Sequence, residues 1–178
     1  GYIQGAKAAN PNIKVLTSYV GNFTDTAHAK ELTLAQINQG ADIVFQCASN
    51  AGLGVIDGCA QKQKYVIGVD SDQALAFQSS DPTKAQYILT SALKRVDISI
   101  TTAVKEAQAG TLKYGKSETL GLAENCVGLG TYNKAVTKDV QDKITEFSKK
   151  IQSGSIKVDT AFGKSTSEIE AVKASVKP

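Results

Sequence analysis

The stretch ADIVFQCASNAGLGVIDGCAQKQKYVIGVDSDQ (residues 41–73) decides the predicted fold. Its first eight residues are nearly continuously apolar, which is typical of a strand buried on both faces of a parallel sheet. A helix of small residues is predicted at 51–63, and the run KYVIGVD (64–70) predicts a second strand. A strand, a helix and a strand in succession form the repeating unit of a parallel α/β sheet.

The same alternation continues upstream of this unit. A helix is predicted at 2–10, and IKVLTSYV (13–20) is rich in β-branched and aromatic residues, which predicts a strand. The helix that follows has Thr24 or Asp25 as its N-cap and ends at Gly40.

Downstream, AQYILTSAL (85–93) contains a further strand, and a long helix at about 92–109 ends at Gly110. Residues 1–110 are therefore predicted to form a doubly wound, mainly parallel α/β lobe with helices on both faces and right-handed crossovers. A helix at the start of such a lobe should follow a strand, so we expect the first strand of the lobe to be absent from this sequence.

The last third of the chain has a different character. Residues 111–135 are Gly-rich and are predicted to form extended connecting segments. The segment KDVQDKITEFSKKIQSG (138–154) predicts an amphipathic helix. A possible strand, IKVDTAF (156–162), and a polar tail complete the prediction.

Composition excludes several classes of protein. The net charge is only +3, and no run of Lys or Arg is interleaved with aromatic residues, so nucleic acid is not a predicted partner. Apolar runs are too short to cross a membrane, and no signal peptide or initiator Met is present. Because the chain already begins within a predicted helix, we expect upstream sequence to be missing. One histidine and three cysteines without C-x-x-C spacing argue against a structural zinc site. Cys47 and Cys59 are predicted to be buried thiols, and the sequence leaves open whether any two of the three cysteines form a disulfide.

Candidate chemistry lies where the predicted strands end, because ligands of open α/β sheets bind outside the carboxyl ends of the strands. Four loops should meet there, namely 21–25, 48–54, 70–73 and 90–94. The groups they offer are Phe23, Ser49, Asn50, Asp70, Asp72 and Lys94, with Asp25 as a further candidate.

These groups suit binding better than catalysis. The one imidazole, His28, lies inside a predicted helix, and Ser49 is not in a G-x-S-x-G context, so neither an enzyme nor a cofactor is predicted. Binding needs only two kinds of group. A carboxylate accepts hydrogen bonds from sugar hydroxyls, and an aromatic ring stacks on a heterocycle. The residues alone leave other roles open: Asp70 or Asp72 as a turn cap, Phe23 in the core, Lys94 as a solvated side chain.

Several segments, taken in order, resemble one family. They are GYIQGAKAANPNIKVLTSYVGNFTDTAHAKELTLAQINQGADIVFQCASNAGLGV, YVIGVDSDQ, ILTSALKRVD and GLAENCVGLG. Together they are similar to the carboxyl-terminal portion of basic membrane lipoproteins, the purine-nucleoside receptor-like substrate-binding proteins of ABC transporters. The resemblance implies a type I periplasmic-binding-protein lobe whose partner lobe is missing from this chain. It also implies a hinge within 111–135 and a segment, 136–178, that packs on the missing lobe.

The resemblance further implies a function. The protein would capture a nucleoside, by default a purine, outside the cytoplasm, deliver it to an ABC permease, and carry a lipid anchor in its full-length form. Phe23 would stack on the base, Asp70 would hold the ribose hydroxyls and Lys94 would line the sugar side, with Asp72 orienting Asp70. Ser49 and Asn50 replace residues of a Gly-rich loop of the type AGGTG, so they would crowd the pocket or add hydrogen bonds. The alternatives are a nucleotide-acting enzyme or regulator, or a sensory ligand-binding domain of the same fold.

Overall fold

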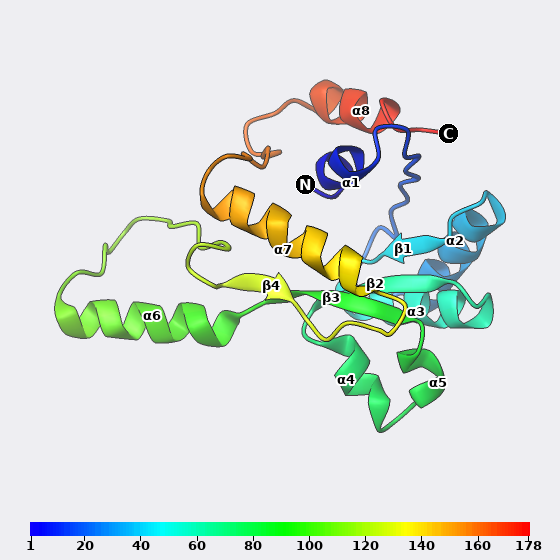
Figure 1. Ribbon diagram of the computed structural model, residues 1–178, viewed down its shortest axis with the longest axis horizontal. Helices are drawn as coiled ribbons and strands as arrows, with labels where there is room; N and C mark the ends of the chain where they lie inside the picture. Colours follow the sequence, from blue (N-terminus) through cyan, green and yellow to red (C-terminus); the bar gives the residue numbers. More distant parts are fainter.

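A four-stranded sheet organises the computed structural model, which describes all 178 residues (Figure 1). The strands β1 (Ile43–Phe45), β2 (Tyr65–Asp70), β3 (Ile88–Lys94) and β4 (Val127–Leu129) follow one another across the sheet. The first three are parallel, and β4 pairs with β3 in the antiparallel sense. The prediction of an α/β fold with a mainly parallel sheet is therefore confirmed.

The main core lies between this sheet and two helices. Helix α2 (Thr26–Asn38) packs on α3 (Gly52–Gln61), which follows a short 3₁₀ turn, η1 (Ser49–Ala51). Eight buried residues form the core cluster: Ala29, Val44, Ala51, Val55, Ile56, Cys59, Val66 and Ile88. The small residues predicted for the helix at 51–63 lie in α3, where they let this helix approach α2 closely.

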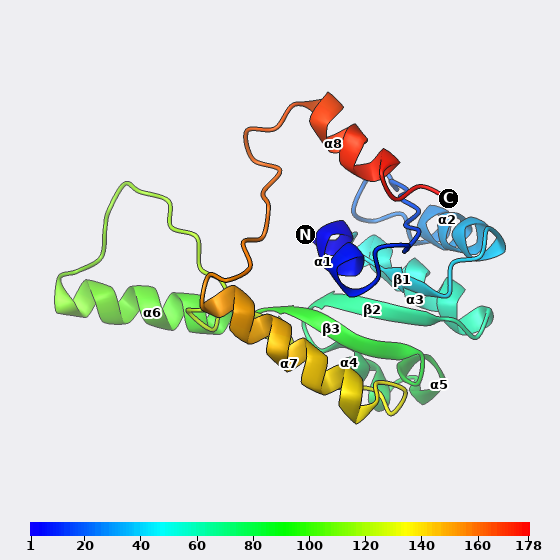
Figure 2. The same cartoon turned by 45° about the horizontal axis from the view of Figure 1, so that its top comes forward.

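Helices lie on both sides of the sheet, although they do not pack equally closely on its two faces. In Figures 1 and 2, α2 and α3 lie behind the strands, whereas α7 (Lys138–Gln152) crosses in front of them. Helix α1 (Tyr2–Ala9) lies near α8 (Thr166–Ala174) and the carboxyl terminus, and α6 (Val96–Ala109) projects away from the rest of the chain. No helix is both long enough and apolar enough to cross a membrane.

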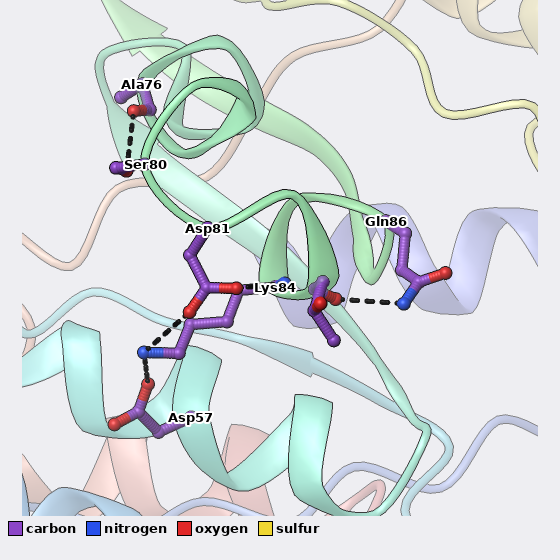
Figure 3. A network of polar contacts seen from close by, with 7 residues as sticks. Asp57, Ala76, Ser80, Asp81, Lys84 and Gln86 are labelled. Carbon is purple, nitrogen blue, oxygen red and sulfur yellow. Dashed lines mark hydrogen bonds and ion pairs between the residues drawn. The ribbon is translucent and has the colours of Figure 1, made fainter.

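Two short helices connect β2 to β3. They are α4 (Gln73–Gln78) and α5 (Pro82–Ala85). Lys84 on α5 holds them to α3: its ammonium lies 2.8 Å from the Asp57 carboxylate and 3.3 Å from that of Asp81 (Figure 3). The hydrogen bond to Asp57 is the main reason that the pKa of Lys84 is raised. Because all three side chains are partly exposed, each pair contributes at most about 1 kcal/mol.

Four predictions of secondary structure are corrected. Residues 13–20 run extended but belong to no strand, because no neighbouring chain offers them a ladder of hydrogen bonds. Residues 156–162 also form no strand, and the supposed polar tail contains helix α8. The helix predicted from residue 92 begins at Val96, because β3 continues to Lys94.

Other predictions hold. Gly110 ends α6 in the left-handed conformation that favours glycine, and α7 covers the predicted amphipathic segment. The connecting region 111–135 is irregular apart from β4.

Candidate functional site

A pocket of about 340 Å³ opens at the carboxyl ends of β2 and β3. It is lined by Phe23, Cys47, Ser49, Val69, Asp70 and Lys94. The structure thus brings together four of the predicted side chains, which come from four separate loops or strand ends. Asp25, Asn50 and Asp72 do not line this pocket.

Phe23 is held out toward solvent by the loop that carries it. Asn22 Oδ1 accepts hydrogen bonds from the amides of Thr24 (2.9 Å) and Asp25 (2.8 Å), which fixes a tight turn around Phe23. The Phe23 carbonyl accepts from the Ala51 amide at 2.9 Å, tying this loop to the one after β1. The ring is 67% exposed, so Phe23 is not a core residue. Its face is free to stack on a flat ligand.

Asp70 occupies a strained position at the end of β2. Its φ is +67°, and the Ser71 amide donates to the Val69 carbonyl at 2.9 Å, so Asp70 is the middle residue of a three-residue turn. Left-handed backbone costs a residue with a Cβ about 1–3 kcal/mol, and such strain concentrates at functional sites. The carboxylate pairs with Lys94 at the end of the neighbouring strand, and the cap of the next helix, α4, is Asp72. Asp70 is therefore not a helix cap.

Lys94, at the end of the neighbouring strand, pairs with Asp70. The Lys94 ammonium lies 2.9 Å from an Asp70 carboxylate oxygen, and the two side chains are 65% and 48% exposed. A pair this open adds little to stability. Its arrangement leaves lone pairs of the carboxylate and protons of the ammonium available to a ligand in the pocket.

Asp72 has a structural role. One of its oxygens caps α4 by accepting from the Leu75 amide at 3.3 Å, and the other accepts from the Thr131 amide at 2.6 Å. Burial alone would raise the pKa of Asp72, but the hydrogen bonds from Thr131, Leu75 and Ala74 outweigh it, and the pKa is lowered. Asp72 thus fixes the turn that carries Asp70 against the segment after β4.

Asp25 and Asn50 lie near the pocket without lining it. The Asp25 carboxylate accepts from the His28 amide at 2.9 Å and caps α2, which is one of the two N-caps predicted for that helix. Asn50 lies exposed in η1. Ser49 beside it does reach the pocket, in a left-handed conformation with φ +52°.

Cys47 lines the pocket, although the sequence predicted a buried thiol. It is exposed and free, whereas Cys59 is buried as predicted; Cys126 is buried, and no disulfide is formed. Although Cys47 is accessible, partial desolvation of its thiol, followed by the charge of Asp70, raises the pKa of this group, so it stays neutral at physiological pH. The apolar run at 41–48 did not reveal this position, because an apolar residue near the end of such a run can lie either inside or at the surface.

A buried amide network supports the pocket from below. Gln46 Nε2 donates to Gln73 Oε1 at 2.9 Å, and the same oxygen accepts from the Val69 amide at 3.1 Å. The Gln73 amide in turn donates to Ser91 Oγ at 3.1 Å. Gln46 is only 2% exposed. This network links the residue that follows β1 to β2 and β3, and the one sequence signal for it was a glutamine within the apolar run IVFQCA.

Replacing Gln73 with alanine is expected to lower the free energy of unfolding by about 2 kcal/mol, because it leaves two donors, Gln46 Nε2 and the Val69 amide, without an acceptor. Urea unfolding followed by circular dichroism measures this loss. Gln86→Ala is the matched control, since its side chain bonds only the nearby Thr83 carbonyl on the surface and should change stability little. Equal stability of the two variants would contradict the network's role.

This chain resembles known proteins in family, sequence and structure. A family described as ABC transporter substrate-binding protein PnrA-like matches residues 1–161. The CD4+ T-cell-stimulating antigen of Listeria monocytogenes is 32% identical over 167 residues, which cover 89% of this chain and 47% of that protein. The ABC transporter nucleoside-binding protein BmpA of Lactococcus lactis is 31% identical over 168 residues, with the same two coverages. The chain therefore spans about half the length of these curated relatives.

The fold has solved counterparts as well. The crystal structure of a transcriptional activator of the comK gene from Bacillus halodurans superposes with a TM-score of 0.76 at 26% identity, covering 86% of this chain and 51% of that one. The matched family is one of substrate-binding proteins, which agrees with the prediction that the chain is not an enzyme. With the motifs, the fold and a family match over residues 1–161 in agreement, this chain belongs to the PnrA-like family of ABC transporter substrate-binding proteins.

Proposed function

We propose that the pocket binds a nucleoside, by default a purine nucleoside. The observation that carries this proposal is the convergence of Phe23, Asp70 and Lys94 on one pocket at the sheet edge. The aromatic face of Phe23 suits a heterocyclic base, and the two carboxylate oxygens of Asp70 suit a sugar with neighbouring hydroxyls. The positive charge of Lys94 suits a sugar oxygen. A relative that is 31% identical to this chain is named a nucleoside-binding protein, which supports the same assignment.

The contacts follow from the chemistry of each group. The base stacks on the exposed ring of Phe23. Two adjacent ribose hydroxyls donate to the carboxylate of Asp70, which the strained turn holds in place before the ligand arrives. Lys94 stays paired with Asp70 and donates a hydrogen bond to a sugar oxygen. Ser49 adds a hydroxyl where a glycine-rich loop would offer only backbone, so it selects among nucleosides that differ in the sugar.

The pocket is only half of a complete site. At about 340 Å³ it is small for a ligand that should be mostly buried, and Phe23 and Lys94 remain largely exposed. We assign the other wall to a second lobe, in the part of the full-length protein that this chain does not span. Closure of two lobes about a hinge within 111–135 would bury the nucleoside.

The carboxyl-terminal part offers a surface for that second lobe. The apolar face of α7, formed by Val140, Ile144, Phe147 and Ile151, has no fully buried residue, and Val140 is 45% exposed. We propose that residues 136–178 pack on the missing lobe through this face. The closed protein would then deliver its ligand to an ABC permease from outside the cytoplasm, held at the membrane by a lipid anchor.

Calorimetric titration of the full-length protein tests the proposed ligand class. Inosine, guanosine and adenosine are expected to bind, whereas free ribose, which lacks the base, should bind far more weakly. A nucleotide should also bind weakly, because its phosphate adds negative charge beside Asp70. Failure of all three nucleosides to bind would overturn the proposal.

A regulatory role is the second candidate, favoured by the structural counterpart that is named a transcriptional activator. The two roles differ in the cell. Deleting the gene should reduce uptake of radiolabelled guanosine if the protein serves a transporter. Unchanged uptake together with altered transcription on guanosine addition would favour the regulatory role.

A further inference from the structure

Two glutamine side chains join two walls of the ligand pocket through one hydrogen bond. Gln46 follows β1 directly, and Gln73 is the first residue of α4. Gln46 Nε2 donates to Gln73 Oε1 at 2.9 Å, and we call this contact the glutamine bridge. Neither side chain lines the ligand pocket, so any effect of the bridge on a ligand must act through the residues that do.

Gln46 holds the first wall. Its Oε1 accepts from the Ala48 amide at 3.1 Å, and Ala48 lies between two residues that line the pocket. The same loop is tied to the turn that carries the aromatic ring, because the Ala51 amide donates to the Phe23 carbonyl at 2.9 Å. Gln46 thus anchors the loop against which the Phe23 turn rests.

Gln73 holds the second wall. Besides the Gln46 amide group, its Oε1 accepts from the Val69 amide at 3.1 Å, and both Val69 and Asp70 line the pocket. The Gln73 backbone amide donates at 3.1 Å to the hydroxyl of Ser91, a fully buried residue of β3. Gln73 is thus bonded to the residue that immediately precedes the strained position of Asp70.

The fold leaves room for both side-chain amides and for little else. A Cβ at Gly52, the first residue of α3, would overlap the Gln46 amide group. A Cβ at Gly68 in β2 would overlap both Gln73 Oε1 and Ser91 Oγ. Packing therefore confines the two glutamines, and neither can turn away without leaving a buried donor or acceptor unpaired.

The hydrogen bonds require different chemistry from the two glutamines. Gln46 must both accept, from a backbone amide, and donate across the bridge. Gln73 Oε1 only accepts, from two donors. An ionised glutamate has no donor, so it would break the bridge at position 46 but would keep both bonds at position 73.

We infer that Gln46 and Gln73 are positioning residues whose bridge sets the spacing between Phe23 and Asp70. The inference rests on the proposed nucleoside site, in which the base lies against one wall and the sugar against the other. With the bridge intact, both walls are in place before the ligand arrives. Without it, a nucleoside must order the two walls as it binds, which lowers its affinity.

The variant Gln46→Glu of the full-length protein makes the bridge depend on pH. Burial raises the pKa of a carboxyl group, so the new side chain should be protonated at about pH 5 and ionised at about pH 8. When protonated, it donates to Gln73 Oε1 as the amide did; when ionised, it presents a second acceptor to that oxygen. Calorimetry should give an inosine affinity within about twofold of the wild type at the lower pH and at least about tenfold weaker at the higher pH.

Each affinity is divided by that of the wild type at the same pH, which removes the titration of the native groups. The ionisable side chains of the loops and strand ends that meet here are Asp25, Cys47, Asp70, Asp72 and Lys94. Gln86→Glu is the matched control, because the Gln86 side chain is exposed and bonds only the nearby Thr83 carbonyl. Its relative affinity should be the same at both pH values.

Two further variants separate the lost donor from the added charge. Gln73→Glu keeps an acceptor for both donors, so its relative affinity should not differ between the two pH values. Gln46→Met has a side chain of similar length that cannot form the bridge and carries no charge, so it should bind inosine more weakly at both. Wild-type affinity in Gln46→Met would overturn the inference. An equal fall at the higher pH in both glutamate variants would also overturn it, because added charge would then be the cause.

A measurement without ligand keeps the bridge testable if the wild type binds no nucleoside, a result that would refute the proposed ligand alone. The Val69 amide has Gln73 Oε1 as its acceptor. In Gln46→Glu, hydrogen exchange of this amide, followed by NMR, should be at least about tenfold faster than in the wild type at about pH 8 and equal to it at about pH 5. Equal rates at the higher pH would show that the bridge does not hold the second wall.

Discussion

Replacing Gly54 with alanine is expected to lower the free energy of unfolding by about 3 kcal/mol or more, toward the upper end of the cost of overpacking a core. A Cβ at this position of α3 would overlap the Thr26 carbonyl oxygen of α2 and lie 2.8 Å from the carbonyl carbon and 3.1 Å from the Lys30 amide nitrogen. All of these atoms are backbone, so no side chain can rotate away. The two helices must separate, and the core cluster beneath them must loosen.

Gly5→Ala is the matched control for this prediction. Gly5 lies inside α1, and a Cβ there would meet nothing within 4 Å. Because alanine is the better helix former, this variant should be neutral or gain about 0.5–1 kcal/mol. Urea unfolding monitored by circular dichroism compares the two variants. Equal midpoints would show that the backbones of α2 and α3 are not in close contact at Gly54.

Replacing Asp70 with glycine is expected to move stability and binding in opposite directions. Glycine relieves the strain of a φ of +67°, so the free energy of unfolding should rise by about 1 kcal/mol. Loss of the exposed ion pair with Lys94 subtracts little from this gain. Nucleoside affinity should fall by about 2–4 kcal/mol, because the charge-assisted hydrogen bonds from the sugar hydroxyls are lost.

Two further variants separate charge from shape. Asp70→Asn keeps a side chain that tolerates the left-handed turn but removes the charge, so it should lose affinity with little change in stability. Asp139→Asn removes one exposed carboxylate from the first turn of α7 and should leave affinity unchanged. Calorimetry on the full-length protein gives the affinities, and thermal unfolding gives the stabilities. Unchanged nucleoside affinity in Asp70→Gly would show that Asp70 has a purely structural role and does not bind the sugar.

The strand–helix–strand unit at 41–73 was predictable because its pattern is local and strong. Continuous apolar runs that end in turn residues leave few alternatives, and β1, α3 and β2 all appear within it. Residues 13–20 carry an equally strong strand signal but form no strand. Strand propensity describes how a residue fits a pleated surface, whereas a strand exists only when a neighbour completes its hydrogen bonds.

Helix α8 was missed for a different reason. Its apolar residues are sparse, yet Ser165 and Glu168 form a capping box, in which each side chain bonds the other residue's amide. The spacing S-x-x-E was visible in the sequence and is a known start signal of helices. A search for capping boxes, rather than for apolar periodicity alone, would have found this helix.

The pocket itself was only partly predictable. The rule that parallel strands end at a shared edge brought Phe23, Ser49, Asp70 and Lys94 together correctly. Cys47 was missed because the sequence does not show on which side of a buried strand its last residue emerges. The support from Gln46 and Gln73 was missed because their hydrogen bond joins residues 27 positions apart.

The proposed nucleoside site is tested most directly by a crystal structure of the full-length protein grown with guanosine. Two ribose hydroxyl oxygens should lie within hydrogen-bonding distance of the Asp70 carboxylate, with the base stacked on the Phe23 ring and a second lobe closed over both. A nucleoside bound without contact to Asp70 or Phe23, or lodged between residues 13–20 and β1, would contradict this account.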